Sequence, residues 1–305
     1  MSLLYAAKVS ERVYLLDTHA LSQPRTVGAY LIKGPKPALV DCGYATSYRN
    51  VLGGLIEAGV QPSEIRYLIP THVHLDHAGG AGRLLKEMPD AEVVAHENGV
   101  QHLVDPTRLI ASATRVFGEA TMRLYGLPTP IPSDRVTPVG RETSLDLGDG
   151  VTLTLIHTPG HAPHQISVLL GESMMLITAD AVGIYYPDVP TLIPTTPPPS
   201  FEPSQLVASV GLLAQTSPRE LLIPHFGVVK DVNFVLGETA RKVPEWVAEV
   251  QRMSQRGMQL DEISGEMTKK VQAEAGVEDL PVHAEVSART SVMGILHYLS
   301  RRAEV

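Results

Sequence analysis

The chain has 305 residues, of which 44% are hydrophobic, 19% charged and 5% aromatic, a composition typical of a soluble globular protein. Its formal net charge of −8 argues against a nucleic-acid partner, because polyanion binding requires clustered Lys and Arg. No segment approaches the roughly 18 consecutive apolar residues of a membrane span. The first residues do not show the basic region followed by a long apolar region that is typical of a signal peptide. We therefore expect a cytoplasmic protein that does not bind membranes, and the single cysteine fits a reducing compartment.

Short strands and helices alternate along the first half of the chain. Runs rich in β-branched and aromatic residues, separated by Gly and Pro, predict antiparallel strands at 12–18, 27–34 and 37–43. The hydrophobic pattern then predicts a helix at 46–60, a buried strand at 66–71, a helix at 81–88, a strand at 91–97 and a longer helical insertion at 106–126. This alternation is typical of an α/β architecture.

The second half is richer in strands and ends in helices alone. Strand-like runs up to Asp180 precede a helix at 202–216 and a strand at 220–227. We therefore expect two similar β-then-α units, packed sheet on sheet with helices outside. Beyond about residue 235 the pattern is amphipathic, with a helix expected to begin at Pro244. This change divides the chain into a main domain at 1–235 and a C-terminal helical extension at 236–305 that packs on it.

A histidine-rich segment follows the expected strand at 66–71. In "THVHLDHAGG", four residues, His72, His74, Asp76 and His77, fall within six positions. Imidazole and carboxylate are the usual nitrogen and oxygen ligands of zinc-like ions. A turn after a strand can point His72 and His74 one way and the other two residues another, an arrangement that suits two metal ions better than one.

Further candidate ligands stand at the ends of other strands. His161 follows "VTLTLIHT", Asp180 ends "MMLITAD" and His225 ends "ELLIPHFG", where chemistry usually lies in layered folds. A lone histidine is more often an ordinary core or surface residue, but a His-x-His-x-Asp-His run with three strand-end partners is hard to obtain by chance. His164 lies close to His161 in sequence and is a candidate for facing the substrate.

These motifs resemble those of the metallo-β-lactamase-fold hydrolase superfamily, through "LVDCG", "THVHLDHAGG", "TPGHAPHQIS", "ITADAV" and "IPHFG" in chain order. The resemblance implies that the main domain is a catalytic four-layer αββα sandwich, followed by the helical extension. It also implies the metal ligands: His72, His74 and His161 for a first ion, Asp76, His77 and His225 for a second, and Asp180 as a bridge. Asp41 would then orient the ligand segment by hydrogen bonding.

The same residues separate branches of the family. The β-lactamases best known from antibiotic resistance carry a cysteine at the second metal, whereas here the corresponding strand ends in Asp180 and the only cysteine is Cys42. Flavodiiron proteins have glutamate at the position of His74 and carry a flavodoxin-like domain. The family's nucleases act on RNA, and the negative net charge of this chain argues against such a substrate. Glyoxalase II-like thioesterases, acyl-homoserine lactonases and hydrolases of small esters or phosphotriesters remain.

The resemblance to these members implies a dinuclear metal-dependent hydrolase that acts on a small ester, lactone or phosphotriester through a metal-bridging hydroxide. Two zinc ions are expected, with iron or manganese as alternatives. Asp76 or Asp180 would handle the proton, and Tyr185 or Tyr186 would stabilise the oxyanion. A glyoxalase II-like thioester hydrolase and a mononuclear iron enzyme resembling persulfide dioxygenases stay open as alternatives. The expected partner is a small-molecule substrate, and whether the protein forms a homodimer stays an open question.

Two segments outside the motifs are expected to line the substrate pocket. The loop 183–203 leaves the metal site directly and carries seven prolines, which stiffen it. The helix at 106–126 presents an apolar stripe. Because the only cationic residues in these segments are three arginines of the helix, the sequence predicts a neutral, partly apolar substrate in preference to a glutathione thioester with its two carboxylates.

Overall fold

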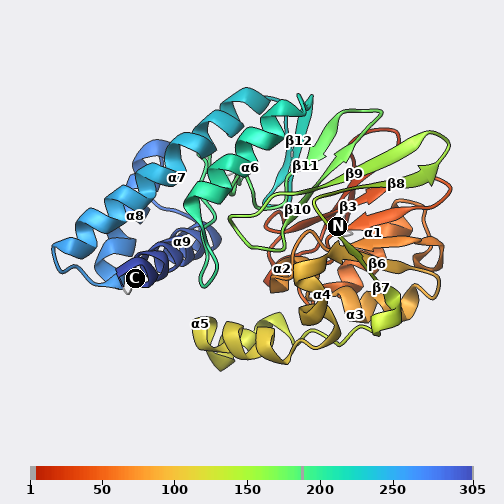
Figure 1. Cartoon of the computed structure of the whole chain (residues 1–305), viewed down its shortest axis with the longest axis horizontal. Coiled ribbons are helices and arrows are strands. Elements are labelled where there is room, and N and C mark those ends of the chain that lie inside the picture. The colour runs from red at the N-terminus through yellow and green to blue at the C-terminus, as the bar shows by residue number, and fades with distance from the viewer. Residues whose placement is uncertain (1–4, 187–188, 304–305) are drawn as a thin grey trace. The chain divides into compact units, whose positions relative to one another are not determined.

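A computed structural model describes residues 5–186 and 189–303 of the chain. These residues form two compact units, each made of two stretches of the chain. Unit 1 comprises the chain up to His157 together with His164–Ala179, and unit 2 comprises Thr158–Pro163 together with the chain from Asp180 onward. In Figure 1, unit 1 includes the red, orange and yellow parts of the chain and unit 2 includes the blue parts.

A seven-stranded sheet forms the frame of unit 1, with its strands side by side in chain order. They are β1 (Ala6–Lys8), β2 (Val13–Asp17), β3 (Gly28–Ile32), β4 (Ala38–Val40), β5 (Tyr67–Ile69), β6 (Glu92–His96) and β7 (Val136–Val139). The pairs from β1 to β4 are antiparallel, which confirms the prediction for the first strands. The pairs from β4 to β7 are parallel and therefore need crossover connections.

Helices lie in the connections between these parallel strands. They are α1 (Tyr48–Glu57), α2 (Leu75–Ala78), α3 (Ala81–Leu84), α4 (Glu97–Val104) and α5 (Thr107–Tyr125). Leu31 of β3 packs in one core cluster with Leu55 of α1. Tyr30 and Ile32 point to the opposite face because side chains alternate along a strand, and both are fully buried. A sheet buried on both faces needs a second covering layer.

Four antiparallel strands form a second layer in unit 1. They are β8 (Glu142–Gly148), β9 (Val151–His157), β10 (Ile166–Leu170) and β11 (Met175–Ile177), paired in chain order. Their inward residues, such as Leu153 and Val168, are fully buried. The Ile166 N–H donates to the Thr71 carbonyl at 2.8 Å. This bond ties the start of β10 to the segment that carries the predicted metal ligands.

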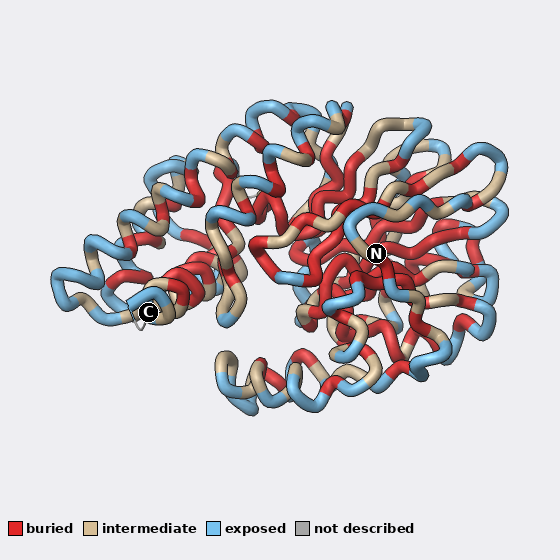
Figure 2. Tube along the Cα trace, in the orientation of Figure 1, coloured by how far each residue is buried: buried red, intermediate tan, exposed pale blue. Residues whose placement is uncertain are grey.

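Unit 2 contains a hairpin and the helices of the C-terminal part. The hairpin is β12 (Glu220–Ile223) with β13 (Gly227–Val229), and the helices are α6 (Pro203–Gln215), α7 (Val232–Gln255), α8 (Leu260–Ala275) and α9 (Val282–Ala303). Helices α7, α8 and α9 pack on one another and bury Trp246, Ile263 and Val292. Figure 2 shows buried inner faces and exposed outer faces along these helices. Two β-sheets flanked by helices, with further helices at the C-terminus, confirm the predicted α/β sandwich fold.

One predicted helix start is wrong, and one predicted helix is interrupted. Helix α7 does not begin at Pro244 but runs from Val232 through it. The proline removes one helical hydrogen bond, but Val235 and Leu236 are buried before it, and their burial stabilises the preceding turns. The expected domain boundary at 235/236 falls inside this helix and stays a prediction. Helix α5 is not continuous, because Gly118 interrupts it with φ 79° and ψ 159°, a conformation that glycine adopts at little steric cost.

The remaining differences concern short elements. Strand β1 and helix α4 were not predicted, because a three-residue strand and an eight-residue helix carry little periodic signal. Residues 187–188 of the proline-rich loop lie outside the described residues. Within the described ranges, no helix combines the length and the apolar character needed to cross a bilayer.

Candidate functional site

The ligand loop, defined as residues 71–77, connects β5 to α2 in unit 1. Its first residues follow the end of the strand, and Asp76 and His77 lie in the first turn of α2, which has His74 as its N-cap. The rings of His72 and His77 are buried, while the side chain of Asp76 keeps 24% of its exposure. Because extended and helical backbones direct side chains differently, this short loop can aim its four polar groups at more than one point.

Asp41 holds the ligand loop by three hydrogen bonds. Its Oδ1 accepts from the N–H and from the hydroxyl of Thr71, both at 2.8 Å, and its Oδ2 accepts from Nδ1 of His77 at 2.9 Å. The carboxylate is fully buried, and the residue has a φ of 63°, a conformation that costs free energy in residues other than glycine. The predicted contact between Asp41 and the ligand loop is therefore confirmed.

These bonds decide which nitrogen of two imidazole rings carries the proton. A carboxylate only accepts, so Nδ1 of His77 is protonated and its Nε2 has the lone pair. The Thr71 hydroxyl already donates to Asp41, so its oxygen accepts from Nδ1 of His72, at 3.1 Å. In the neutral form of each ring, Nε2 is then the nitrogen that can bind a metal ion.

The spacing of the donor atoms in the loop fits metal coordination. Nε2 of His72 lies 3.0 Å from Nδ1 of His74, and Nε2 of His77 lies 3.6 Å from Oδ2 of Asp76. Two ligands of one tetrahedral zinc ion, each about 2.0–2.2 Å from it, lie roughly 3.3 Å apart. The donor pairs of the ligand loop are close to that separation.

Unit 2 brings together the other three predicted ligands, which we call the unit 2 trio: His161, Asp180 and His225. Nε2 of His161 lies 3.5 Å from Oδ2 of Asp180, and Nε2 of His225 lies 3.7 Å from Oδ1 of the same carboxylate. All three residues are buried. One carboxylate with a different oxygen near each imidazole is the arrangement that a bridging ligand requires.

The chemistry of the donors fits divalent metal ions. Every predicted ligand belongs to a group of His and Asp side chains that could hold an ion, and imidazole with carboxylate suits zinc, iron and manganese. Cys42 does not join this set. Burial, followed by the charge of Asp41, raises the pKa of its thiol well above the usual range, so Cys42 remains a protonated core residue and not a metal-binding thiolate.

A backbone carbonyl that the sequence did not reveal holds His161. Nδ1 of His161 lies 3.0 Å from the carbonyl oxygen of Thr195. Since a carbonyl only accepts, Nδ1 carries the proton, and Nε2, the nitrogen near Asp180, is the one that can bind a metal ion in the neutral ring. No sequence signal identifies Thr195, because any residue supplies a carbonyl and this one is 34 positions away.

The two candidate tyrosines occupy different surroundings. The Tyr186 side chain is buried, with its hydroxyl 3.3 Å from Oγ of Ser287 and its ring edge-on to His283. The backbone of Tyr185 pairs with His225, which lies in the turn between β12 and β13, since the Tyr185 N–H donates to the His225 carbonyl at 2.7 Å. Tyr185 thus helps to place His225, and its side chain is only partly buried.

His164 lies beside the ligand loop within unit 1. It is buried, and its Nδ1 accepts from the Val73 N–H at 3.4 Å. Its ring centroid is 6.4 Å from that of His72 and 6.3 Å from that of His74. His164 therefore supports the backbone between two ligands, while its expected contact with substrate stays a prediction.

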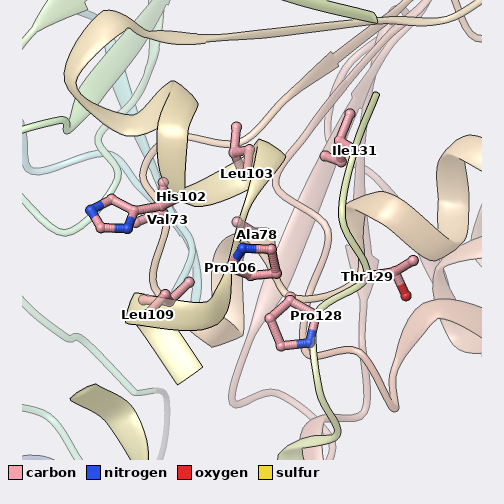
Figure 3. Close-up of a pocket in the computed structure, with 10 residues that line it drawn as sticks. Val73, Ala78, His102, Leu103, Pro106, Leu109, Pro128, Thr129 and Ile131 are labelled. Atoms are coloured by element: carbon pink, nitrogen blue, oxygen red, sulfur yellow. The ribbon is translucent and has the colours of Figure 1, made fainter. Parts of the chain in front are cut away.

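A small cavity adjoins the ligand loop (Figure 3). Val73, Leu103 and Leu109 are among its apolar lining residues, and His102 contributes an imidazole. Burial, followed by the charge of Arg108, lowers the pKa of His102, which favours the neutral ring. The space open to the centre of a water-sized sphere is about 10 Å³, near the minimum that holds one water molecule.

Helix α5 reaches the ligand loop through its apolar face. Ala113, Met122 and Tyr125 of α5 form one buried cluster with Leu75, the residue between His74 and Asp76. The helix therefore packs on the loop, while its expected place in the wall of the substrate pocket stays a prediction. Its three arginines, Arg108, Arg115 and Arg123, are all exposed.

Comparison with known proteins agrees with this fold. The family model of the metallo-beta-lactamase superfamily matches residues 23–225. A metallo-beta-lactamase fold-containing protein of Sulfurisphaera tokodaii is 32% identical over 186 residues, which are 57% of this chain and 69% of that protein. A flavo-diiron protein of Clostridium acetobutylicum is 27% identical over 159 residues, which are 52% of this chain but only 34% of that protein. The chain thus spans about a third of the flavo-diiron relative.

Solved structures show the same fold. An archaeal metallo-beta-lactamase superfamily protein from Sulfolobus tokodaii gives a TM-score of 0.65 at 24% identity, covering 90% of this chain and 93% of that one. A metallo-beta-lactamase family protein from Thermus thermophilus gives 0.68 at 19% identity, covering 97% and 95%. Since the family model also matches more than half of the sequence, the chain belongs to the metallo-beta-lactamase superfamily.

Proposed function

We propose that this protein is a dinuclear metal-dependent hydrolase of a small ester, lactone or phosphotriester. The family and the His and Asp clusters support a metal-dependent, hydrolase-like function. The observation that carries the proposal is the hydrogen bonding of Nδ1 in three ligand histidines. In His72, His77 and His161, Nδ1 lies within hydrogen-bond distance of a protein oxygen, which directs Nε2 to serve as the metal-binding nitrogen.

The number of donors supports two ions. Four residues of the ligand loop and the unit 2 trio together exceed the three or four protein ligands that one zinc ion takes. We assign His72, His74 and His161 to one ion and Asp76, His77 and His225 to the other, with Asp180 shared. Asp180 has a carboxylate oxygen near each of two imidazoles, which supports its bridging role.

When bound, such ions activate water at neutral pH and polarise the substrate oxygen. The chain's own groups complete the chemistry. Asp76 is the ligand with 24% side-chain exposure, so it is the carboxylate best able to exchange a proton with solvent. Tyr185 is the better candidate for donating a hydrogen bond to the substrate oxygen, because the Tyr186 hydroxyl lies against Ser287.

We further propose that the substrate is neutral and partly apolar. The arginines of α5 are exposed while its apolar side chains pack toward the ligand loop. Helix α5 therefore offers no buried cation to a charged group of the substrate. A glutathione thioester carries two carboxylates, and desolvating them without partners costs several kcal/mol. The glyoxalase II-like alternative would need cationic partners from elsewhere in the chain.

The test is a hydrolysis panel on metal-replete protein, with a hydrophobic lactone, an aryl ester, a phosphotriester and a glutathione thioester compared by kcat/KM. The proposal expects turnover of at least one of the first three and its loss on chelation. A thioester turned over at least tenfold better than the rest would favour the glyoxalase II-like alternative. Oxygen consumption with a persulfide by protein holding one iron would favour the dioxygenase-like alternative.

A further inference from the structure

The loop segment Pro194–Thr195–Thr196 joins a candidate metal ligand to the last helix of unit 2. Its central residue faces His161, since the Thr195 carbonyl accepts from Nδ1 of that ring at 3.0 Å. Its two flanking residues face α9. The position of the carbonyl therefore depends on what holds its neighbours.

Ser291 of α9 holds both neighbours. Its hydroxyl donates to the Pro194 carbonyl at 2.6 Å and accepts from the Thr196 N–H at 3.3 Å. The Thr196 hydroxyl in turn donates to the Ser291 carbonyl at 2.9 Å. Both Ser291 and Thr196 are buried, so water does not replace these bonds at low cost. The two peptide units around Thr195 are thus fixed to the helix.

Close backbone contact reinforces this attachment. A Cβ added at Gly294, one turn along α9 from Ser291, would lie 1.7 Å from the Thr196 carbonyl oxygen. Only glycine permits this approach. The helix surface therefore meets the loop without an intervening side chain, and a shift of α9 would move the loop with it.

A second attachment lies earlier in the same loop. Nζ of Lys242 on α7 donates to the Leu192 carbonyl at 2.9 Å and to the Thr191 hydroxyl at 2.7 Å, and its charge is balanced by Glu274 of α8 at 2.6 Å. The lysine side chain is almost completely buried. All three C-terminal helices thus contribute to holding residues 191–196.

We propose that the C-terminal helical extension is the element that positions the metal ligand His161, and that Ser291 is the positioning residue that acts through the Thr195 carbonyl. The extension then has a role in the site beyond packing. Fixing the carbonyl fixes the Nδ1–H tautomer and the direction of Nε2, which sets how well His161 binds an ion. The metal-binding part of this inference rests on the proposed function, whereas the tautomer part concerns the protein without metal.

The test compares wild-type protein with Ser291→Ala, Thr196→Val and, as a matched control, Ser300→Ala. Ser300 also lies on α9, but its hydroxyl donates only to the nearby His297 carbonyl. Zinc affinity is measured by competition with a chelator, the His161 tautomer in metal-free protein by nitrogen-15 NMR, and folding by urea unfolding. Thr196→Val keeps the shape of the side chain and removes one bond, so it serves if Ser291→Ala folds poorly.

We expect Ser291→Ala to weaken zinc binding about 3–10-fold, less than the roughly 10–100-fold loss that follows removal of a direct partner, and to mix the two His161 tautomers. Thr196→Val should show a smaller change of the same kind, and Ser300→Ala none. Wild-type affinity and a pure Nδ1–H tautomer in both folded test variants would overturn the inference. A wild-type protein that binds none of zinc, iron and manganese would refute the proposed function, and the tautomer measurement would still decide the positioning role.

Discussion

Replacing Asp41 by Asn tests how far one buried carboxylate organises the ligand loop. The amide has one oxygen, whereas the carboxylate serves two groups of donors, Thr71 with its N–H and hydroxyl and His77 with Nδ1–H. If the amide oxygen faces Thr71, the NH₂ meets Nδ1–H of His77, donor against donor. His77 must then move its proton to Nε2 and lose its metal-binding lone pair. The opposite orientation leaves both Thr71 donors without an acceptor.

The cost can be estimated from these bonds. A hydrogen bond to a charged group contributes about 1.5–3 kcal/mol to stability, so Asp41→Asn should lower the free energy of unfolding of the metal-free protein by about 2 kcal/mol. Loss of a hydrogen-bonding partner of a ligand histidine typically weakens metal binding by about 10–100-fold. Both effects should appear together.

The assay measures urea unfolding without metal and zinc affinity by chelator competition. Asp17→Asn is the matched control, because Asp17 also accepts from backbone N–H groups, those of His19 and Arg25, and has no predicted ligand among those contacts. The control should bind zinc like the wild type. An Asp41→Asn protein with wild-type zinc affinity and unchanged stability would show that the tautomer argument is wrong.

Other parts of the molecule offer three further tests. Asp180→Asn should cut kcat/KM by orders of magnitude with the fold intact by circular dichroism, since an amide cannot replace a shared carboxylate; unchanged turnover would remove Asp180 from the site. Burial, followed by the charge of His157, lowers the pKa of His96. Between that lowered pKa and about 6.5, His96 is protonated in the unfolded chain but neutral in the folded chain. The free energy of unfolding should therefore fall as pH drops through this range. His96→Asn, which can still accept from the Asn98 N–H, should flatten that slope in urea titrations at pH 7.5 and 5.5, and an unchanged slope would contradict the assignment. Trp246→Ala, at a fully buried position of α7, should cost about 3–5 kcal/mol of unfolding free energy, and a loss under 1 kcal/mol would mean that α7 packs differently.

The sequence predicted central strands such as β3 well because their residues are buried on both faces, which leaves the run 28–32 without polar interruption. It failed where tertiary packing outweighs local preference. Pro244 suggests the start of a helix, but buried residues on both sides of it keep α7 continuous. The interruption at Gly118 could not be predicted from the sequence, because glycine also occurs within regular helices.

The candidate ligands were visible in the sequence because His and Asp at strand ends carry a distinctive chemistry. The groups that orient them were less visible. Asp41 could be expected from its motif, and Thr71 precedes His72 directly, but the Thr195 carbonyl and its support by Ser291 depend on backbone geometry. Side-chain identity does not encode such contacts, so only the structure reveals them.

Metal content tests the central proposal most directly. Protein purified without added metal, and then reconstituted with zinc and freed of excess, is analysed by inductively coupled plasma mass spectrometry alongside Asp180→Asn. The account predicts about two zinc ions per wild-type chain, fewer in the variant, and lactone or ester hydrolysis that rises with occupancy. A wild-type chain that holds no metal, or that holds a single iron and hydrolyses none of these substrates, would contradict it.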